Sequence, residues 1–159
     1  MTAPRPADGW SVGGISFGSR LILGTGKYPS NEIMQACHQA GGTEMVTVAI
    51  RRIDLTAKTS LLDFVDRKKI RLLPNTAGCY TVKDALLTAD LAREALKTEW
   101  IKLEVIPDPK YLFPDPVGTL KAAEALIREG FTVLPYIHAD PILARKLEVV
   151  DPPSRARPH

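Results

Sequence analysis

The stretch WIKLEVI (residues 100–106) decides how this chain is expected to fold. Along an extended backbone, successive side chains point to opposite faces of a strand. Lys102 and Glu104 fall on one face, between Trp100 and Ile106. The other face is wholly apolar and holds Ile101, Leu103 and Val105. This pattern predicts a strand whose apolar face packs on helices, with a lysine and a glutamate on the opposite side.

Strand-like and helix-like segments alternate on both sides of this stretch. The expected strands, which are short and mostly apolar, are 11–17 (a hairpin broken by Gly13 and Gly14), 21–23, 45–50, 71–73, 100–106 and 131–136. The expected helices are 30–40, 55–64 (only weakly helical), 81–97, 116–130 and 140–147. Ser30, Thr81 and Asp140 suit helix N-caps, and Pro116 and Pro141 suit a first helical turn.

Strands separated by helices predict a parallel sheet with crossover connections. Two α/β architectures remain open from this rhythm alone: an open, doubly wound sheet and a β/α barrel. About five β/α units fit residues 11–148, whereas a complete eight-unit barrel needs about 250 residues. We therefore expect at most part of a barrel, preceded by a flexible segment over 1–10 and followed by a disordered tail over 149–159.

Lys102 and Glu104 are the candidate catalytic pair. Buried charges are costly unless they are paired or used in chemistry. Desolvation favours the neutral amine of a lysine, and a neutral amine can attack a ketone to form an imine. A carboxylate two residues along the same face lies close enough to move protons during imine formation and enolisation. The alternative is an edge strand with a solvated face, on which the two side chains form a surface ion pair.

Other polar residues are expected at the carboxyl ends of the strands, where α/β proteins bind ligands. The candidates for substrate binding are Gly24, Thr25, Arg51, Asn75 and Tyr136. Gly24 and Thr25 belong to GTGK (24–27), which lacks the Walker and GxGxxG patterns and also suits a tight turn. Arg51 could bind an anion or could simply be solvated. Asn75 could hydrogen-bond a ligand or could stabilise its own turn.

Composition narrows the class of protein. Of 159 residues, 45% are hydrophobic and 25% charged, as in an ordinary globular domain. A net charge of +3, with basic residues scattered along the chain, argues against a nucleic-acid partner. No apolar run approaches the roughly 20 residues that span a bilayer, and no secretory or transit signal is evident, so we expect a cytoplasmic location. Cys37 and Cys79 form no CxxC pair and the histidines lie far apart, so no metal site is expected.

Several longer strings resemble the bacterial thiazole synthases of thiamine biosynthesis, in that family's order and at its spacing. They cover almost all of residues 11–148, and LPNTAG together with KLEVIPD is the most specific combination. The strings are LILGTGKYPS (21–30), VTVAIRR (46–52), LLPNTAGCYT (72–81), IKLEVIPDPKYLFPDPVGTLKAAEAL (101–126), EGFTVLPY (129–136) and DPILARKLE (140–148). The resemblance implies a (β/α)8 barrel of the TIM type.

The resemblance also implies an activity and partners. The enzyme would form the thiazole phosphate of thiamine from 1-deoxy-D-xylulose 5-phosphate, dehydroglycine and the thiocarboxylate of a small sulfur-carrier protein. The family's Schiff-base lysine falls on Lys102, and a glutamate with an acid/base role falls on Glu104. Members of the family form homotetramers and dock the sulfur carrier. The resemblance implies no metal or organic cofactor.

The resemblance stops near Glu148, before a sixth strand, a GxPIGSG-like segment and two further β/α units that would supply most phosphate contacts. The last residues, VVDPPSRARPH (149–159), are rich in proline and arginine without periodicity, as in out-of-frame translation. We therefore expect this chain alone to aggregate or to need a partner, and to lack synthase activity.

Two functions from different classes remain open. One is a thiazole synthase without its C-terminal portion. The other is a non-catalytic fragment or binding subunit that keeps an oligomer or carrier-docking surface. A barrel resembling class I aldolases would use the same imine chemistry, but the strings LPNTAG and GTGKYPS argue against it.

Overall fold

A parallel, five-stranded sheet forms the centre of the molecule. The computed structural model describes residues 10–53 and 60–150, the side chain of Arg52 excepted. The strands lie in chain order across the sheet: β3 (Ile22–Gly24), β4 (Met45–Ala49), β5 (Arg71–Asn75), β6 (Trp100–Leu103) and β7 (Thr132–Pro135). A doubly wound sheet reverses its strand order at a switch point, and this order never reverses. The fold is therefore α/β and of the partial TIM-barrel type.

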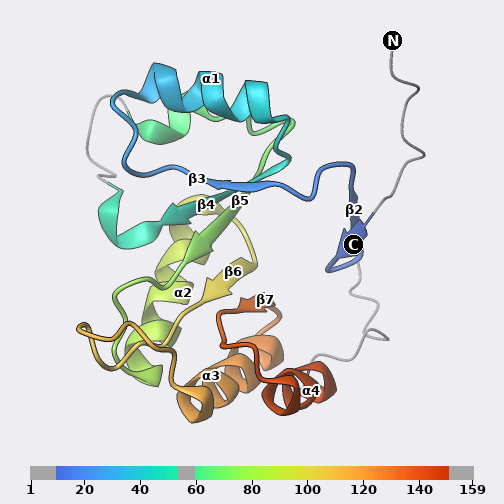
Figure 1. The fold of residues 1–159 in the computed structure, drawn as a ribbon, viewed down its shortest axis with the longest axis vertical. Helices are drawn as coiled ribbons and strands as arrows, with labels where there is room; N and C mark the ends of the chain where they lie inside the picture. The colour runs from blue at the N-terminus through green and yellow to red at the C-terminus, as the bar shows by residue number, and fades with distance from the viewer. Residues whose placement is uncertain (1–9, 54–59, 151–159) are drawn as a thin grey trace.

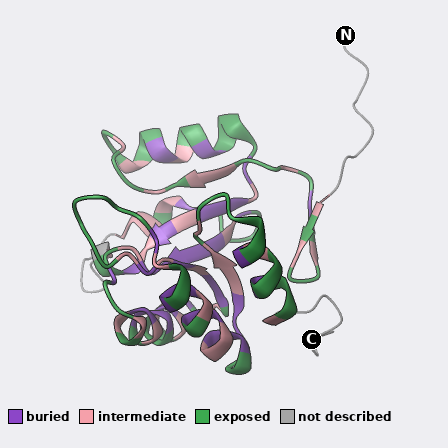
Figure 2. Ribbon diagram, turned by 60° about the horizontal axis from the view of Figure 1, so that its bottom comes forward, coloured by how far each residue is buried: buried purple, intermediate pink, exposed green. Residues whose placement is uncertain are grey.

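The helices follow one another around the outer side of this sheet (Figure 1). They are α1 (Asn31–Gly41), α2 (Val82–Leu96), α3 (Pro116–Arg128) and α4 (Pro141–Val150), with 3-10 turns η1 (Ile50–Arg52) and η2 (Leu61–Phe64). Ile101, Leu103 and Val105 are buried in the core between sheet and helices, as their alternation predicted. Figure 2 shows buried positions concentrated in the strands and on the sheet-facing sides of the helices.

The helices begin at the predicted capping residues. The side chains of Ser30 and Thr81 accept hydrogen bonds from the first turns of α1 and α2. The Asp140 carboxylate accepts from the Ile142 and Leu143 N–H groups at 2.9 and 3.1 Å, with Pro141 as the first residue of α4. These side chains satisfy backbone donors that a helix leaves unpaired at its start, so local chemistry sets these boundaries.

Several predicted boundaries were wrong. β5 continues through Pro74 to Asn75, past the expected end at Leu73. A proline removes one backbone donor but leaves an extended backbone accessible, so Pro74 still pairs in register with Val48. α4 runs to Val150 rather than Leu147, so the first two residues of the expected tail are helical. The described residues exclude 1–9, 54–59 and 151–159. The start of the expected helix 55–64 and the rest of the expected terminal segments therefore lie outside them.

β6 ends at Leu103, short of the predicted end at Ile106, because one threonine side chain replaces strand pairing there. β5 and β6 pair in register at Asn75 and Lys102. The hydroxyl of the buried Thr76 donates to the Glu104 carbonyl and accepts from the Glu104 N–H, each at 2.7 Å. Thr76 therefore fixes the backbone of Glu104 just beyond the strand.

The predicted hairpin is confirmed as β1 (Trp10–Val12) paired antiparallel with β2 (Ile15–Phe17). Phe17 joins Trp100 and neighbouring side chains in a second apolar cluster, separate from the helix-facing core. At the turn, Gly13 and Gly14 both have positive φ, +55° and +79°. Only Gly13 also lies against another element, since a Cβ there would come within 2.8 Å of the Thr132 methyl carbon.

This contact predicts that Gly13→Ala destabilises the fold more than Gly14→Ala, measured by urea denaturation. A left-handed alanine costs about 1–2 kcal/mol at either position. Gly13→Ala adds the overlap with Thr132, which costs about 1–3 kcal/mol more when packing cannot relax. Gly14→Ala is the matched control, because nothing lies within 4 Å of its added Cβ. Equal losses of unfolding free energy would show that the contact has no effect.

The Thr76 bridge predicts that Thr76→Val lowers the free energy of unfolding. Valine keeps the shape of threonine but removes the hydroxyl that pairs with the Glu104 N–H and carbonyl. Each buried polar group left unpaired destabilises the fold by about 1–3 kcal/mol. Thr119→Val is the control, because the Thr119 hydroxyl is buried without a hydrogen-bond partner among the described residues. That change should be neutral or stabilising. A Thr76→Val protein as stable as the control in urea denaturation would refute the bridge.

Candidate active site

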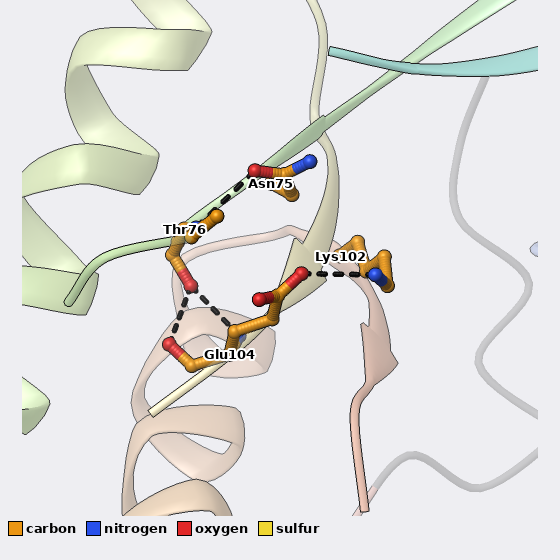
Figure 3. A network of polar contacts seen from close by, with 5 residues as sticks. Asn75, Thr76, Lys102 and Glu104 are labelled. Atoms are coloured by element: carbon orange, nitrogen blue, oxygen red, sulfur yellow. Dashed lines mark hydrogen bonds and ion pairs between the residues drawn. The ribbon is translucent and has the colours of Figure 1, made fainter. Parts of the chain in front are cut away.

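Lys102 and Glu104 form a hydrogen-bonded ion pair on the inner side of the sheet. The Lys102 Nζ lies 2.9 Å from the Glu104 Oε1, and their side chains are 34% and 12% exposed (Figure 3). β6 is flanked by β5 on one side and β7 on the other, so the edge-strand alternative is wrong. A carboxylate this buried interacts more strongly with its partner than two solvated side chains do.

A cavity of about 470 Å³ opens beside Lys102. Its volume lies within the range of about 300–1,000 Å³ that is typical of small-molecule sites. The cavity is lined by Ile22, Leu23, Gly24, Thr47, Leu73, Lys102, Leu134, Pro135, Tyr136 and Ile137. The lysine is one of few polar groups in a mostly apolar wall, so it is the reactive group that a ligand in this cavity would meet.

Tyr136 follows β7 and covers the lysine. The Lys102 Nζ lies 5.4 Å from the centre of the Tyr136 ring, which is the geometry of a cation–π contact. The Tyr136 N–H donates to the Leu103 carbonyl at 2.8 Å, which ties the residue to β6. Tyr136 thus lies next to the candidate nucleophile at the carboxyl end of the sheet, and its role in substrate binding stays a prediction.

The pair is held by backbone contacts that leave its side chains free to react. Thr76 holds the backbone of Glu104, while the Glu104 carboxylate turns towards Lys102 (Figure 3). The amine must lose a proton before it can attack a carbonyl carbon, and Glu104 lies within direct proton-transfer distance. The arrangement therefore suits imine formation with a ketone or aldehyde.

Gly24 lines the cavity, but Thr25 does not. The Thr25 hydroxyl instead donates to the Thr47 carbonyl at 3.0 Å. A buried imidazole also holds this loop, since the His38 Nε2 lies 2.9 Å from the Gly24 carbonyl oxygen. Lys27, at the end of the loop, has φ of +67°, a conformation that few non-glycine residues adopt. The GTGK segment is thus a tightly held turn with Gly24 facing the cavity.

Asn75 and Arg51 are engaged elsewhere. The Asn75 side-chain oxygen accepts from the Ala77 N–H at 3.2 Å, which is the role in its own turn that the sequence left open. The exposed Arg51 guanidinium donates to the Gly78 carbonyl, so it braces the loop after β5 and does not line the cavity. Of the predicted substrate-binding residues, only Gly24 and Tyr136 lie with Lys102 around the cavity.

Sequence reasoning missed Thr47, Leu73 and Leu134, which complete the cavity wall. Alternation within β4, β5 and β7 was the signal for them, because each shares its strand's inner face. It also missed Thr76, whose bond to Glu104 joins residues 28 apart in the chain. No sequence pattern marks a single hydroxyl that bridges two distant segments.

The described residues contain neither a cluster of metal ligands nor a helix that could span a membrane. No group of three or more His, Cys, Asp or Glu side chains there is arranged to hold a metal ion. Within the same residues, none of the helices has the length and apolar character needed to cross a membrane. Cys37 is exposed, and Cys79 is buried with its Sγ 3.2 Å from the Thr88 hydroxyl.

Comparison with known proteins gives consistent matches. The family model of the thiazole biosynthesis protein ThiG matches residues 11–152. A thiazole synthase of Myxococcus xanthus is 58% identical over 141 residues, which cover 87% of this chain and 54% of that protein. One of Solibacter usitatus is 55% identical over 143 residues, which cover 89% and 55%. The chain thus spans about half the length of these relatives.

A solved structure supports the fold. The crystal structure of the Amycolatopsis orientalis BexX/CysO complex contains a similar chain, with a TM-score of 0.74 and 29% sequence identity. The match covers 88% of this chain and 58% of that one. Since the family model and close relatives cover nearly all of the described residues, the chain belongs to the thiazole biosynthesis protein ThiG family.

Proposed function

We propose that this chain supplies the imine-forming lysine of a thiazole synthase, with Lys102 as nucleophile and Glu104 as its proton-transfer partner. The observation that carries the proposal is the 2.9 Å contact between the Lys102 Nζ and the Glu104 Oε1 beside a cavity on the inner side of the sheet. Relatives named thiazole synthase, at 58% and 55% identity, support this assignment over other imine-forming enzymes.

The proposed substrates are 1-deoxy-D-xylulose 5-phosphate, dehydroglycine and the thiocarboxylate of a small sulfur carrier. The product is the thiazole phosphate used for thiamine. The sugar phosphate carries a ketone at C2, which is the group that a lysine amine attacks. The largely apolar wall around Lys102 suits this step, because a cavity that excludes water favours loss of water from the adduct.

In the proposed first step, Lys102 transfers a proton to Glu104 and its amine attacks C2 of the ketone. Glu104 returns the proton to the C2 oxygen, which leaves as water as the carbon–nitrogen double bond forms, and Glu104 is again a carboxylate. The imine withdraws electrons from the C3–H bond, so the C3 proton can pass to the Glu104 carboxylate and give an enaminol. Protonation at C2 and loss of the C3 hydroxyl proton then place an oxo group at C3. The thiocarboxylate sulfur attacks C3, and the carrier leaves as its carboxylate with the former C3 oxygen. The nitrogen of dehydroglycine then replaces the Lys102 amine at C2 as the ring closes, which frees the lysine.

A protein partner follows from this chemistry, because the sulfur arrives on a carrier. The similar structure from Amycolatopsis orientalis is a complex of BexX with a second protein, CysO, which supports a protein partner for this fold. We propose that the partner here is a small sulfur-carrier protein whose C-terminal thiocarboxylate reaches the cavity. We also propose that the whole protein assembles as a homotetramer.

Borohydride reduction in the presence of 1-deoxy-D-xylulose 5-phosphate should attach the sugar phosphate to Lys102. Reduction converts the imine into a stable amine, and peptide mass spectrometry locates it. Lys102→Arg should abolish the adduct, because arginine keeps the positive charge but does not form the imine. Lys83→Arg, on the exposed side of α2, should leave it unchanged. An adduct on another lysine would contradict the proposal, whereas an adduct on a full-length relative but none on this chain would indicate that the C-terminal portion is needed.

Glu104→Gln should slow the exchange of the C3 proton of the same substrate with D2O by about 10²–10⁴-fold, the usual contribution of a positioned general base. Proton NMR of the C3 position follows this exchange. Glu94→Gln, at an exposed position of α2, should exchange at the unaltered rate. If Glu104→Gln exchanged as fast as that control, another group would be the base.

A further inference from the structure

Cationic side chains gather around a hollow of about 230 Å³ at the end of the sheet opposite to Lys102. Arg71 stands at the amino end of β5, and Lys97 caps the carboxyl end of α2. The five cations lining the hollow are Arg67, Lys68, Lys69, Arg71 and Lys97. Among its described lining residues there is no Asp or Glu. In a chain with a net charge of only +3, this is a local concentration of positive charge: four of the cations lie in RKKIR (67–71), and the fold adds Lys97.

Most of these cations form no ion pair within the described residues, although Glu94 and Glu99 line an adjoining hollow with Arg71 and Lys97. The Lys69 Nζ lies 3.9 Å from the Asp66 Oδ2, but both side chains are well exposed, so the pair is weak. Lys68, Arg71 and Lys97 form no ion pair with any carboxylate of the described residues. Like charges held around one hollow repel one another, and a bound anion would relieve that repulsion.

Both guanidinium groups are already held in position. The Arg67 Nη2 donates to the Leu96 carbonyl at 3.1 Å, at the end of α2. The Arg71 guanidinium carbon lies 4.9 Å from the centre of the Trp100 ring. A guanidinium presents its N–H donors in a planar fork that matches carboxylate and phosphate oxygens. Fixed forks lose less side-chain freedom when an anion binds, so these two arginines are preorganised.

We propose that this hollow, defined by Arg67, Lys68, Lys69, Arg71 and Lys97, binds a small anion with two linked phosphates. Its volume lies below the range of about 300–1,000 Å³ typical of drug-sized ligands, which favours a small anion. A single phosphate ester carries about −1.5 to −2 charges at pH 7. It would leave more than half of the positive charge unmatched, whereas a diphosphate group comes closer to balance.

The site is separate from the proposed imine chemistry. It lies at the amino ends of the strands, while Lys102 and its cavity lie towards their carboxyl ends. The two hollows share no lining residue. Anion binding here would therefore tie the 67–72 segment to the end of α2 without occupying the catalytic cavity.

Isothermal titration calorimetry with inorganic pyrophosphate tests the site on the full chain at low salt. The unaltered chain should bind pyrophosphate more tightly than inorganic phosphate, and added NaCl should weaken both. Lys68→Gln/Lys97→Gln should weaken pyrophosphate binding at least tenfold. These two lysines are chosen because neither forms a described ion pair or caps a neighbouring carbonyl with its side chain, so circular dichroism should show an unchanged fold.

Two further variants make each outcome decisive. Lys83→Gln/Lys121→Gln removes the same charge from exposed positions on α2 and α3 and should bind pyrophosphate within about twofold of the unaltered chain, since distant exposed charges are largely screened. Lys102→Ala should also bind normally.

Absence of binding to the unaltered chain at millimolar pyrophosphate would overturn the proposal. So would an equal loss in the Lys83/Lys121 variant, which would indicate diffuse charge, or a loss in Lys102→Ala, which would place the anion in the catalytic cavity.

Discussion

The hydroxyl group of Thr76 is the contact on which the arrangement of the Lys102–Glu104 ion pair depends. β5 and β6 share one in-register pair, Asn75 with Lys102, and beyond it the ladder stops. Thr76 takes over by bonding both the N–H and the carbonyl of Glu104 at 2.7 Å. Because that hydroxyl is fully buried, water does not compete for it, and the bonds are effective. The carboxylate of Glu104 is thereby left to face Lys102.

The two faces of β6 divide stability from chemistry. The outer face carries Ile101 and Leu103, both fully buried against the helices, and each such side chain contributes about 1.5–3 kcal/mol through burial. The inner face carries the ion pair, which burial penalises. The fold tolerates that penalty because the strand is secured by its other face and by Thr76. A polar pair is thus kept in a half-buried position where its proton can move between nitrogen and oxygen.

The features set by neighbouring residues were predictable. Alternation in WIKLEVI predicted that Lys102 and Glu104 share a face, and capping chemistry predicted the start of α4 at Pro141. Strand order was not predictable from that rhythm, because a barrel and a doubly wound sheet use the same β/α units. Arg51 and Asn75 show the same limit at the site. Their residue types suit a ligand, but only the folded chain brings the Gly78 carbonyl to one and the Ala77 N–H to the other.

The central claim is that the amine of Lys102 forms an imine in this cavity. ¹³C NMR of 1-deoxy-D-xylulose 5-phosphate labelled at C2 observes that bond directly, without a chemical trap. With the unaltered chain, the account predicts loss of the ketone signal and a protein-bound imine signal, and it predicts only the ketone with Lys102→Arg. An imine signal that persists in Lys102→Arg, or a ketone signal that both this chain and a full-length relative leave untouched, would contradict the account.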